Sequence, residues 1–214
     1  MFASREDAGR KLGHFLEGEG IAVDLVLGLP RGGVVVAAEV ANVLQVLLDV
    51  LIVRKIGHPW HREFAVGALA EGDVVVLDEL ARANHWLLRE GIQEIIEEEK
   101  QRLREYQERF HPGRQLEVAE KDIVIVDDGL ATGATMEAGV LAARQKGANR
   151  ILVAAPVGSI NAMRRLEKVA DDVILLIQDP DFEAVGRYYE TFTQTSDEEV
   201  VNLIRGQGTT IQKV

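Results

Sequence analysis

The sequence predicts an α/β fold in which helices cover both faces of one parallel sheet. Short apolar segments alternate with segments of helical periodicity along most of the chain. Apolar strands that alternate with helices in this way are typical of parallel sheets buried on both sides. No internal repeat and no low-complexity linker interrupts the 214 residues, so we expect a single domain over residues 1–214.

The first quarter of the chain predicts a helix, a strand, a second helix and a second strand. Ser4 to Asp7 matches a helix capping box, and apolar residues follow at helical spacing. The elements expected after this helix are a strand at Val23–Leu27, a tight loop at Leu29–Gly33, a helix at Val34–Leu44 and a strand at Asp49–Arg54.

The middle of the chain predicts a polar loop, a hairpin and a long helix. The loop covers Gly57–Glu63, and two short strands, 65–70 and 74–77, flank a turn at Glu71–Asp73. Residues 82–110 show one apolar face and many charges elsewhere, which predicts a long amphipathic helix that packs on a sheet or on a second copy of the chain. We therefore expect a homodimer.

The second half repeats the alternation of strands and helices. We expect strands at 123–126, 151–155 and 173–177, and helices at 135–146 and 159–169. The segment from 178 onward is mixed in character and rich in aromatic residues.

The composition excludes several functional classes. The chain has no cysteine, which excludes disulfides, thiolate catalysis and cysteine-bound zinc. A net charge of -11 argues against a nucleic-acid partner, although residues 31–62 are locally basic and suit an anionic small ligand. The N-terminus is not of the signal-peptide type and no apolar run is long enough to cross a bilayer, so we expect a cytoplasmic protein without a membrane partner.

The segment Ile123–Thr135 gives the clearest indication of chemistry. A buried strand delivers Asp127 and Asp128 to the sheet edge where ligands bind in parallel folds, and a loop of small residues then leads into a helix. Consecutive amides and two threonine hydroxyls at a helix N-terminus form an anion site, and Gly133 lets the backbone approach closely. Two carboxylates would repel phosphate but can accept hydrogen bonds from vicinal ribose hydroxyls. The segment predicts a binding loop for a phosphorylated ribose; alternatively, the acids only cap the turn.

Residues 124–135, VIVDDGLATGAT, resemble the fingerprint of type I phosphoribosyltransferases. In that family the paired acids hold the ribose hydroxyls of phosphoribosyl pyrophosphate (PRPP), and the ATGAT part holds its 5-phosphate. The resemblance implies that PRPP is bound by Asp127, Asp128, Gly129, Ala131, Thr132, Gly133, Ala134 and Thr135. It also implies the type I phosphoribosyltransferase fold, with a small hood built from the terminal segments at about 178–214.

Two further segments extend the resemblance. Leu29–Gly33 lies where the family places its pyrophosphate loop, and residues 54–57, RKIG, are similar to a segment of adenine phosphoribosyltransferases. The donor contacts implied by these segments are Arg31, Gly32, Gly33, Arg54 and Lys55. Arg54 and Lys55 leave their strand in opposite directions, so we expect only one of them to point into the site. Lys55 suits a flexible phosphate contact, and Arg54 suits an interface equally well.

The acceptor side of the site is less defined. The aromatic tail resembles the hood that covers the nucleobase, which makes Phe182, Tyr188 and Tyr189 candidates for base stacking; a plain aromatic core is an equal alternative. Ala131 stands where hypoxanthine-guanine enzymes have an aspartate, which argues against that assignment. Glu63 and Glu71 are candidates for a general base, or are simply solvated acids.

These features together predict transfer of a 5-phosphoribosyl group from PRPP to a nitrogenous acceptor, a purine, with release of pyrophosphate. Asp127, Asp128, Arg31 and Lys55 would be the catalytic residues. Mg²⁺ is the expected cofactor, held by Asp127 and Asp128 directly or through water. The alternative is a regulator or sensor that binds PRPP or a nucleotide without catalysis, and a phosphatase is a weaker third possibility.

Overall fold

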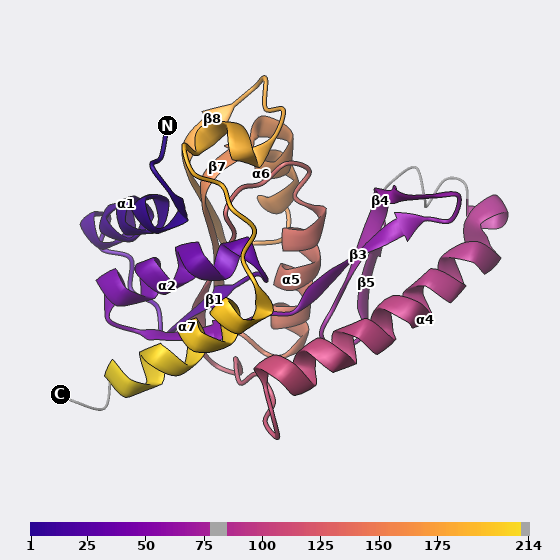
Figure 1. The fold of residues 1–214 in the computed structure, drawn as a ribbon, viewed down its shortest axis with the longest axis horizontal. Helices are drawn as coiled ribbons and strands as arrows, with labels where there is room; N and C mark the ends of the chain where they lie inside the picture. Colours follow the sequence, from indigo (N-terminus) through magenta and orange to yellow (C-terminus); the bar gives the residue numbers. More distant parts are fainter. Residues whose placement is uncertain (78–84, 211–214) are drawn as a thin grey trace.

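A five-stranded parallel sheet forms the centre of the molecule (Figure 1). The structure is a computed structural model that describes residues 1–77 and 85–210. The strands, in their order across the sheet, are β2 (Leu47–Val50), β1 (Leu25–Gly28), β6 (Asp122–Val126), β7 (Arg150–Ser159) and β8 (Asp172–Asp179). The predicted α/β class and the parallel sheet are therefore confirmed.

Helices cover the sheet on both faces because successive strand residues point to opposite sides. In β6, Ile123 and Ile125 belong to one apolar cluster, whereas Val124 and Val126 belong to the other. The first face carries α5 (Ala134–Gln145) and α6 (Ile160–Leu166), and the second carries α1 (Arg5–Gly18), α2 (Gly32–Leu44) and α7 (Asp197–Thr210).

The register of the sheet brings two loops together. Gly28 at the end of β1 pairs with Val50 of β2 and with Val126 of β6, so all three strands end at the same edge. The segments 29–33 and 127–135 therefore leave adjacent strands side by side, each on its way into a helix.

A hairpin sheet and a long helix project from this body (Figure 1). The antiparallel strands are β3 (Val53–His58), β4 (His61–Ala70) and β5 (Val74–Leu77), and the helix is α4 (His85–Phe110). The hairpin sheet packs between α4 and α5. The predicted long helix is confirmed from residue 85 onward, and its predicted start, residues 82–84, lies outside the described residues.

Two predictions for this region were wrong. The strand expected at residues 49–54 is two strands, because the chain passes from the parallel sheet to the hairpin sheet at Leu51 and Ile52. The apolar run continues through this change of sheet, so its pattern does not reveal it. The polar loop expected at residues 57–63 is the tip of the β3–β4 hairpin, where an irregular register near Gly57 obscures the strand pattern.

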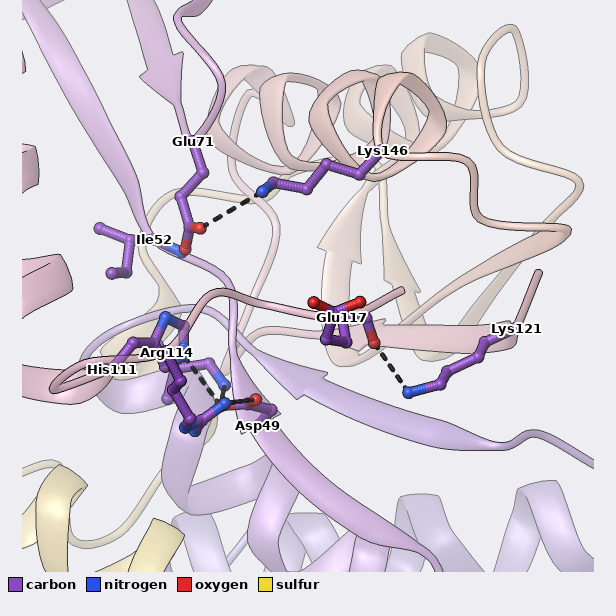
Figure 2. A network of polar contacts seen from close by, with 9 residues as sticks. Asp49, Ile52, Glu71, His111, Arg114, Glu117, Lys121 and Lys146 are labelled. Carbon is purple, nitrogen blue, oxygen red and sulfur yellow. Dashed lines mark hydrogen bonds and ion pairs between the residues drawn. The ribbon is translucent and has the colours of Figure 1, made fainter. Parts of the chain in front are cut away.

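A buried polar network fastens the end of α4 to the parallel sheet, as Figure 2 shows. Nη1 and Nη2 of Arg114 donate to the Asp49 carboxylate, at 2.6 and 2.9 Å. Nε2 of His111 lies 2.9 Å from Oδ1 of the same carboxylate. Although burial alone would raise it, hydrogen bonds from His111 and Arg114 lower the pKa of Asp49 to about 2. The carboxylate is therefore held in its charged form.

The N-terminal residues and the segment that follows β8 meet above the carboxyl edge of the sheet. The amide of Phe2 donates to the carbonyl of Tyr188 at 2.7 Å, and the amide of Glu190 donates back to the carbonyl of Phe2 at 2.9 Å. A 3₁₀ turn, η1 (Val185–Tyr188), belongs to the same layer. This layer, which we call the hood, is formed by residues 1–4 and 180–194.

The last helix is not part of the hood, although the sequence predicted a hood through residue 214. Helix α7 turns away from this layer and packs on α2, β2 and α4. Its N-terminus is a reciprocal capping box: the amide of Glu199 donates to Oγ of Ser196, and the amide of Ser196 donates to Oε2 of Glu199. The Ser-x-x-Glu pattern was visible in the sequence, so this helix could have been predicted.

None of the helices that the structure describes combines the length and the apolar character needed to cross a membrane. The cytoplasmic location and the homodimer stay predictions.

Candidate active site

A cavity of about 270 Å³ lies at the carboxyl edge of the sheet, between the loops that follow β1 and β6. Its walls are formed by Leu29, Pro30, Arg31, Gly32, Lys55, residues 127–136 and Val185. The two loops and the lysine that the sequence singled out therefore face one common space.

Strand β7 fixes the loop that follows β6. The amide of Leu130 donates to the carbonyl of Val157 at 2.9 Å, and the amide of Ser159 donates to the carbonyl of Leu130 at 2.9 Å. Oγ of Ser159 donates to the carbonyl of Ala131 at 2.6 Å. Backbone pairing thus holds the middle of the loop as an extension of the sheet, and the geometry of the cavity floor is set before any ligand arrives.

Two helix N-termini point toward the cavity. Helix α5 begins after Gly133, whose φ of 73° lies in the left-handed region that favours glycine. Helix α2 begins after Arg31, and neither Arg31 nor Gly133 caps its helix with a side-chain hydrogen bond, although the amide of Ala134 donates to Oγ1 of Thr132 at 3.4 Å. The first amides of both helices are therefore available to an anion, and the two helix dipoles add positive potential.

The two acids occupy different surroundings. Asp127 is partly buried, and its Oδ1 accepts a hydrogen bond from the amide of Asp128 at 2.9 Å. Burial raises the pKa of Asp127 well above its usual range, and the adjacent Asp128 carboxylate raises it further, while Lys55 and Arg5 act in the opposite direction. The nearby cations therefore do not fully balance the negative charge of Asp127 when no ligand is bound.

Asp128 is partly exposed and has its own counterion. Nε of Arg5, in the first turn of α1, donates to Oδ2 of Asp128 at 2.7 Å. The hydroxyl of Tyr189 donates to the carbonyl of Asp128 at 2.6 Å. Asp128 is therefore held by its side chain from α1 and by its backbone from the hood.

The glycines of the first loop lie against these acids. A Cβ atom at Gly32 would lie 2.1 Å from Oδ2 of Asp128, and a Cβ atom at Gly33 would lie 2.7 Å from Oδ1 of Asp127. Any larger residue would displace the carboxylates. The two loops predicted separately from the sequence thus fit together only because both positions are glycine.

The cationic side chains of the site separate into two groups. Arg31 and Lys55 line the cavity, and Arg31 lies 3.9 Å from the carboxylate of Asp197 of α7. Arg54 faces α4 instead: its Nε donates to Oε2 of Glu99 at 2.9 Å, and its guanidinium lies 5.3 Å from the ring centroid of Tyr106. Arg54 does not line the cavity of the acid pair, but with Pro30 and Arg31 it lines a smaller cavity, and its contact with the donor stays a prediction.

The aromatic residues of the tail do not line the cavity. Tyr189 is 5% exposed and packs against Phe2 and Phe192, so its ring has no open face for a base. Phe182 and Tyr188 stack on each other with centroids 5.4 Å apart. The hood residue that reaches the cavity is Val185, whose methyl groups pack over Gly129.

Glu71 does not serve this site, contrary to one of the hypotheses from the sequence. It is 2% exposed, and its Oε1 accepts a hydrogen bond from the amide of Ile52 at 3.0 Å. Figure 2 shows it near Lys146 and beside the Asp49 network, and it does not line the cavity of the acid pair. For Glu63 the side chain lies outside the described residues.

The acid pair fits a magnesium ion that is shared with a ligand. Among the described residues, no group of three or more histidine, cysteine, aspartate or glutamate side chains could hold a metal. Magnesium, however, usually takes one or two protein carboxylates and completes its shell with water and substrate phosphates. Hard carboxylate oxygens next to two anion-binding helix N-termini match that donor set.

Arg5 and Val185 were missed by the sequence analysis. Val185 lies in a segment without clear periodicity, so nothing in the pattern marked it. Arg5 left a signal: it is a cation in the first turn of a helix, where acids are favoured, beside Glu6 and Asp7. A residue that is locally unfavourable indicates a distant partner, which is Asp128.

A family model described as the phosphoribosyl transferase domain matches residues 4–191. The chain belongs to the phosphoribosyl transferase family. Two proteins of Mycobacterium tuberculosis, from strains CDC 1551 and H37Rv, are each named as candidate phosphoribosyl transferases. Each is 44% identical over 204 residues, which cover 94% of this chain and 46% of the relative. The chain thus spans about half the length of these curated relatives.

Two solved structures share the fold of this chain. Protein TT1426 of Thermus thermophilus is 40% identical to this chain, with 97% of this chain and 99% of that chain covered and a TM-score of 0.80. The AQ2163 protein of Aquifex aeolicus is 11% identical, with 94% and 84% covered and a TM-score of 0.53, which shows likeness of fold alone. Helix α7 lies beyond the part of the chain that the family model matches.

Proposed function

We propose that this phosphoribosyl transferase moves a 5-phosphoribosyl group from PRPP to a nitrogen acceptor and releases pyrophosphate. One observation carries the proposal: a pair of carboxylates and two helix N-termini open into the same cavity. A ligand that carries vicinal hydroxyls between two phosphate groups matches this arrangement, with the hydroxyls at the carboxylates and one phosphate group at each helix N-terminus. PRPP has that arrangement.

The proposed contacts follow from the chemistry of each wall. The amides of 132–135 and the hydroxyls of Thr132 and Thr135 bind the 5-phosphate at the N-terminus of α5. Asp127 and Asp128 accept hydrogen bonds from the ribose hydroxyls. Arg31, Gly32 and the N-terminus of α2 bind the pyrophosphate from the other side, with Lys55 above it.

The reaction exchanges one bond at the anomeric carbon. The bond to the pyrophosphate oxygen lengthens first, positive charge develops on the ribose ring, and the acceptor nitrogen forms the new bond. Pyrophosphate leaves with the electron pair of the broken bond, and the acceptor nitrogen releases its proton. Arg31 and Lys55 stabilise the charge that develops on the leaving group.

Asp127 and Asp128 would hold Mg²⁺, directly or through water, next to the ribose and diphosphate oxygens. When bound, the ion neutralises charge on the diphosphate and so favours its departure. The carboxylates themselves orient the ribose, and their negative charge favours the positive charge on the ring in the transition state.

A purine is the proposed acceptor. The similarity of residues 54–57 to adenine phosphoribosyltransferases supports this choice, and Val185 offers an apolar surface at the cavity for a planar base. Ala131 lines the cavity without an acid group, so the acceptor would have to lose its proton to water or to the departing pyrophosphate.

Pyrophosphate release tests the proposal. The protein is incubated with magnesium PRPP and, in turn, with purines and other nitrogen bases, and pyrophosphate and the nucleotide product are measured together. We expect release that requires one base and yields its nucleoside monophosphate in equal amount. If PRPP binds and no base causes release, the chain is a PRPP-binding regulator. If PRPP and nucleoside monophosphates both fail to bind, the assigned site is wrong.

A further inference from the structure

Arg5 makes three contacts with residues outside α1, and the helix does not need any of them to form. Its Nε donates to Oδ2 of Asp128 at 2.7 Å, and its Nη1 donates to the carbonyl of Thr193 at 2.6 Å. The guanidinium also lies 3.8 Å from the ring centroid of Phe192. Its side chain is 11% exposed, although the residue belongs to the first turn of a surface helix. One side chain thus joins α1, the hood and the acid pair.

We propose that Arg5 is a positioning residue that fixes the Asp128 carboxylate for the ribose hydroxyls, an inference that rests on the proposed function. Among the described residues, Arg5 supplies the hydrogen bond to this carboxylate, and it uses Oδ2. The rotation of the carboxylate is then set. Its Oδ1 is directed away from Arg5 and can accept a hydrogen bond from a ribose hydroxyl. A preorganised acceptor binds a diol without the entropy loss of ordering its own side chain.

The surroundings of Oδ2 support this role. The Cα of Gly32 approaches so closely that a Cβ atom would lie 2.1 Å from Oδ2 of Asp128 and 2.7 Å from Nε of Arg5. The Arg5–Asp128 pair therefore fills the space under the pyrophosphate loop. Because Thr193 and Phe192 hold the same guanidinium, the position of the hood and the orientation of Asp128 are coupled through Arg5.

The preference of the protein for a sugar with both hydroxyls shows whether Arg5 positions Asp128 or only supports the fold. We would measure the affinities of wild type and Arg5→Met for ribose 5-phosphate, 2-deoxyribose 5-phosphate and magnesium pyrophosphate by calorimetry. The variant should lose about tenfold in affinity for ribose 5-phosphate, the scale of one charge-assisted hydrogen bond. Its affinities for the deoxy sugar and for pyrophosphate should stay as in wild type. The preference for the diol should therefore disappear.

A double-mutant cycle with Asp128→Asn tests whether Arg5 acts through Asp128. In the Asp128→Asn background, Arg5→Met should cause no further loss of ribose 5-phosphate affinity. Arg10→Met is the matched control, because Arg10 lies on the same helix and makes only an exposed ion pair with Glu39 at 3.5 Å. It should bind all three ligands as the wild type does.

Each other outcome has a defined meaning. Unchanged diol selectivity in Arg5→Met, an equal loss for all three ligands, or full additivity with Asp128→Asn would overturn the inference. If Arg5→Met does not fold, Arg5→Lys keeps the charge but cannot span Asp128 and Thr193, and wild-type selectivity in that variant would overturn it too. Failure of the wild type to bind PRPP and ribose 5-phosphate would instead contradict the proposed function.

Discussion

At the scale of single residues, the two adjacent acids have different tasks. Asp127 accepts a hydrogen bond from the amide of Asp128, whereas the Asp128 side chain, which is 15% exposed, is paired with Arg5. A carboxylate with a raised pKa depends on an incoming cation or hydroxyl to stabilise its charged form. Asp128 is already oriented by its pairing with Arg5, so it is the better first contact for the ribose.

Asp128→Asn should weaken PRPP binding about 30-fold, the effect of losing about 2 kcal/mol of charged hydrogen bonding, while the fold stays intact. The measurement is calorimetric titration with magnesium PRPP. Asp172→Asn is a suitable control, because Asp172 begins β8 at the opposite edge of the sheet and its side chain is 51% exposed. Equal PRPP affinity in Asp128→Asn and wild type would refute the role given to Asp128.

Gly32→Ala should weaken PRPP binding, because the new methyl group displaces the carboxylate of Asp128 and the guanidinium of Arg5 from their positions. Gly18→Ala is the matched control: Gly18 ends α1, and nothing lies within 4 Å of a Cβ atom there. We expect the control to bind normally and to gain a few tenths of a kcal/mol in stability, or about 1 kcal/mol at most. Thermal melting and PRPP titration of both variants check this, and normal binding by Gly32→Ala would be inconsistent with the close packing described.

At the scale of elements, strand β3 divides its two adjacent cations between the site and the fold. Lys55 faces the cavity, and Arg54 joins the strand to α4 through Glu99. Glu99 also accepts a hydrogen bond from Arg102 at 2.5 Å, so this acid is the polar centre of the contact between α4 and the hairpin.

Lys55→Met should lower PRPP affinity about tenfold and leave the free energy of unfolding close to that of wild type. Arg54→Met should do the opposite, with a loss of about 1 to 2 kcal/mol in stability and little change in affinity, because Glu99 is 6% exposed and loses a partner. The two variants control for each other. A loss of PRPP affinity confined to Arg54→Met would reverse the assignment.

The Asp49 network predicts a specific acid sensitivity. The pKa of Asp49 is about 2 in the folded chain, and an unfolded aspartate titrates near its usual value of 3.8, so this group stabilises the fold above pH 4. That stability, about 2 kcal/mol, is lost as the pH falls from about 4 to about 2. Asp49→Asn should therefore be less stable than wild type at pH 6, and the difference should shrink toward pH 2. Denaturant unfolding across this range tests the prediction, and a difference independent of pH would contradict it.

At the scale of the whole molecule, the sequence predicted what depends on local pattern. The parallel strands, the helices that follow them and the loop at residues 127–135 were all visible, because apolar periodicity and glycine placement are local properties. The split between β2 and β3 was not, since Leu51 and Ile52 are buried on either side of the change of sheet. Contacts between distant segments, such as Arg5 with Asp128 across 123 positions of sequence, were also hidden.

The central claim is that one cavity holds PRPP between the loops after β1 and β6. Calorimetric titration of the protein with magnesium PRPP tests it most directly, with Asp128→Asn and Lys55→Met measured alongside. The account predicts one PRPP bound per chain in the wild type, and weaker binding in both variants although they melt as the wild type does. Absence of PRPP binding by the wild type, or equal affinity in all three proteins, would contradict it.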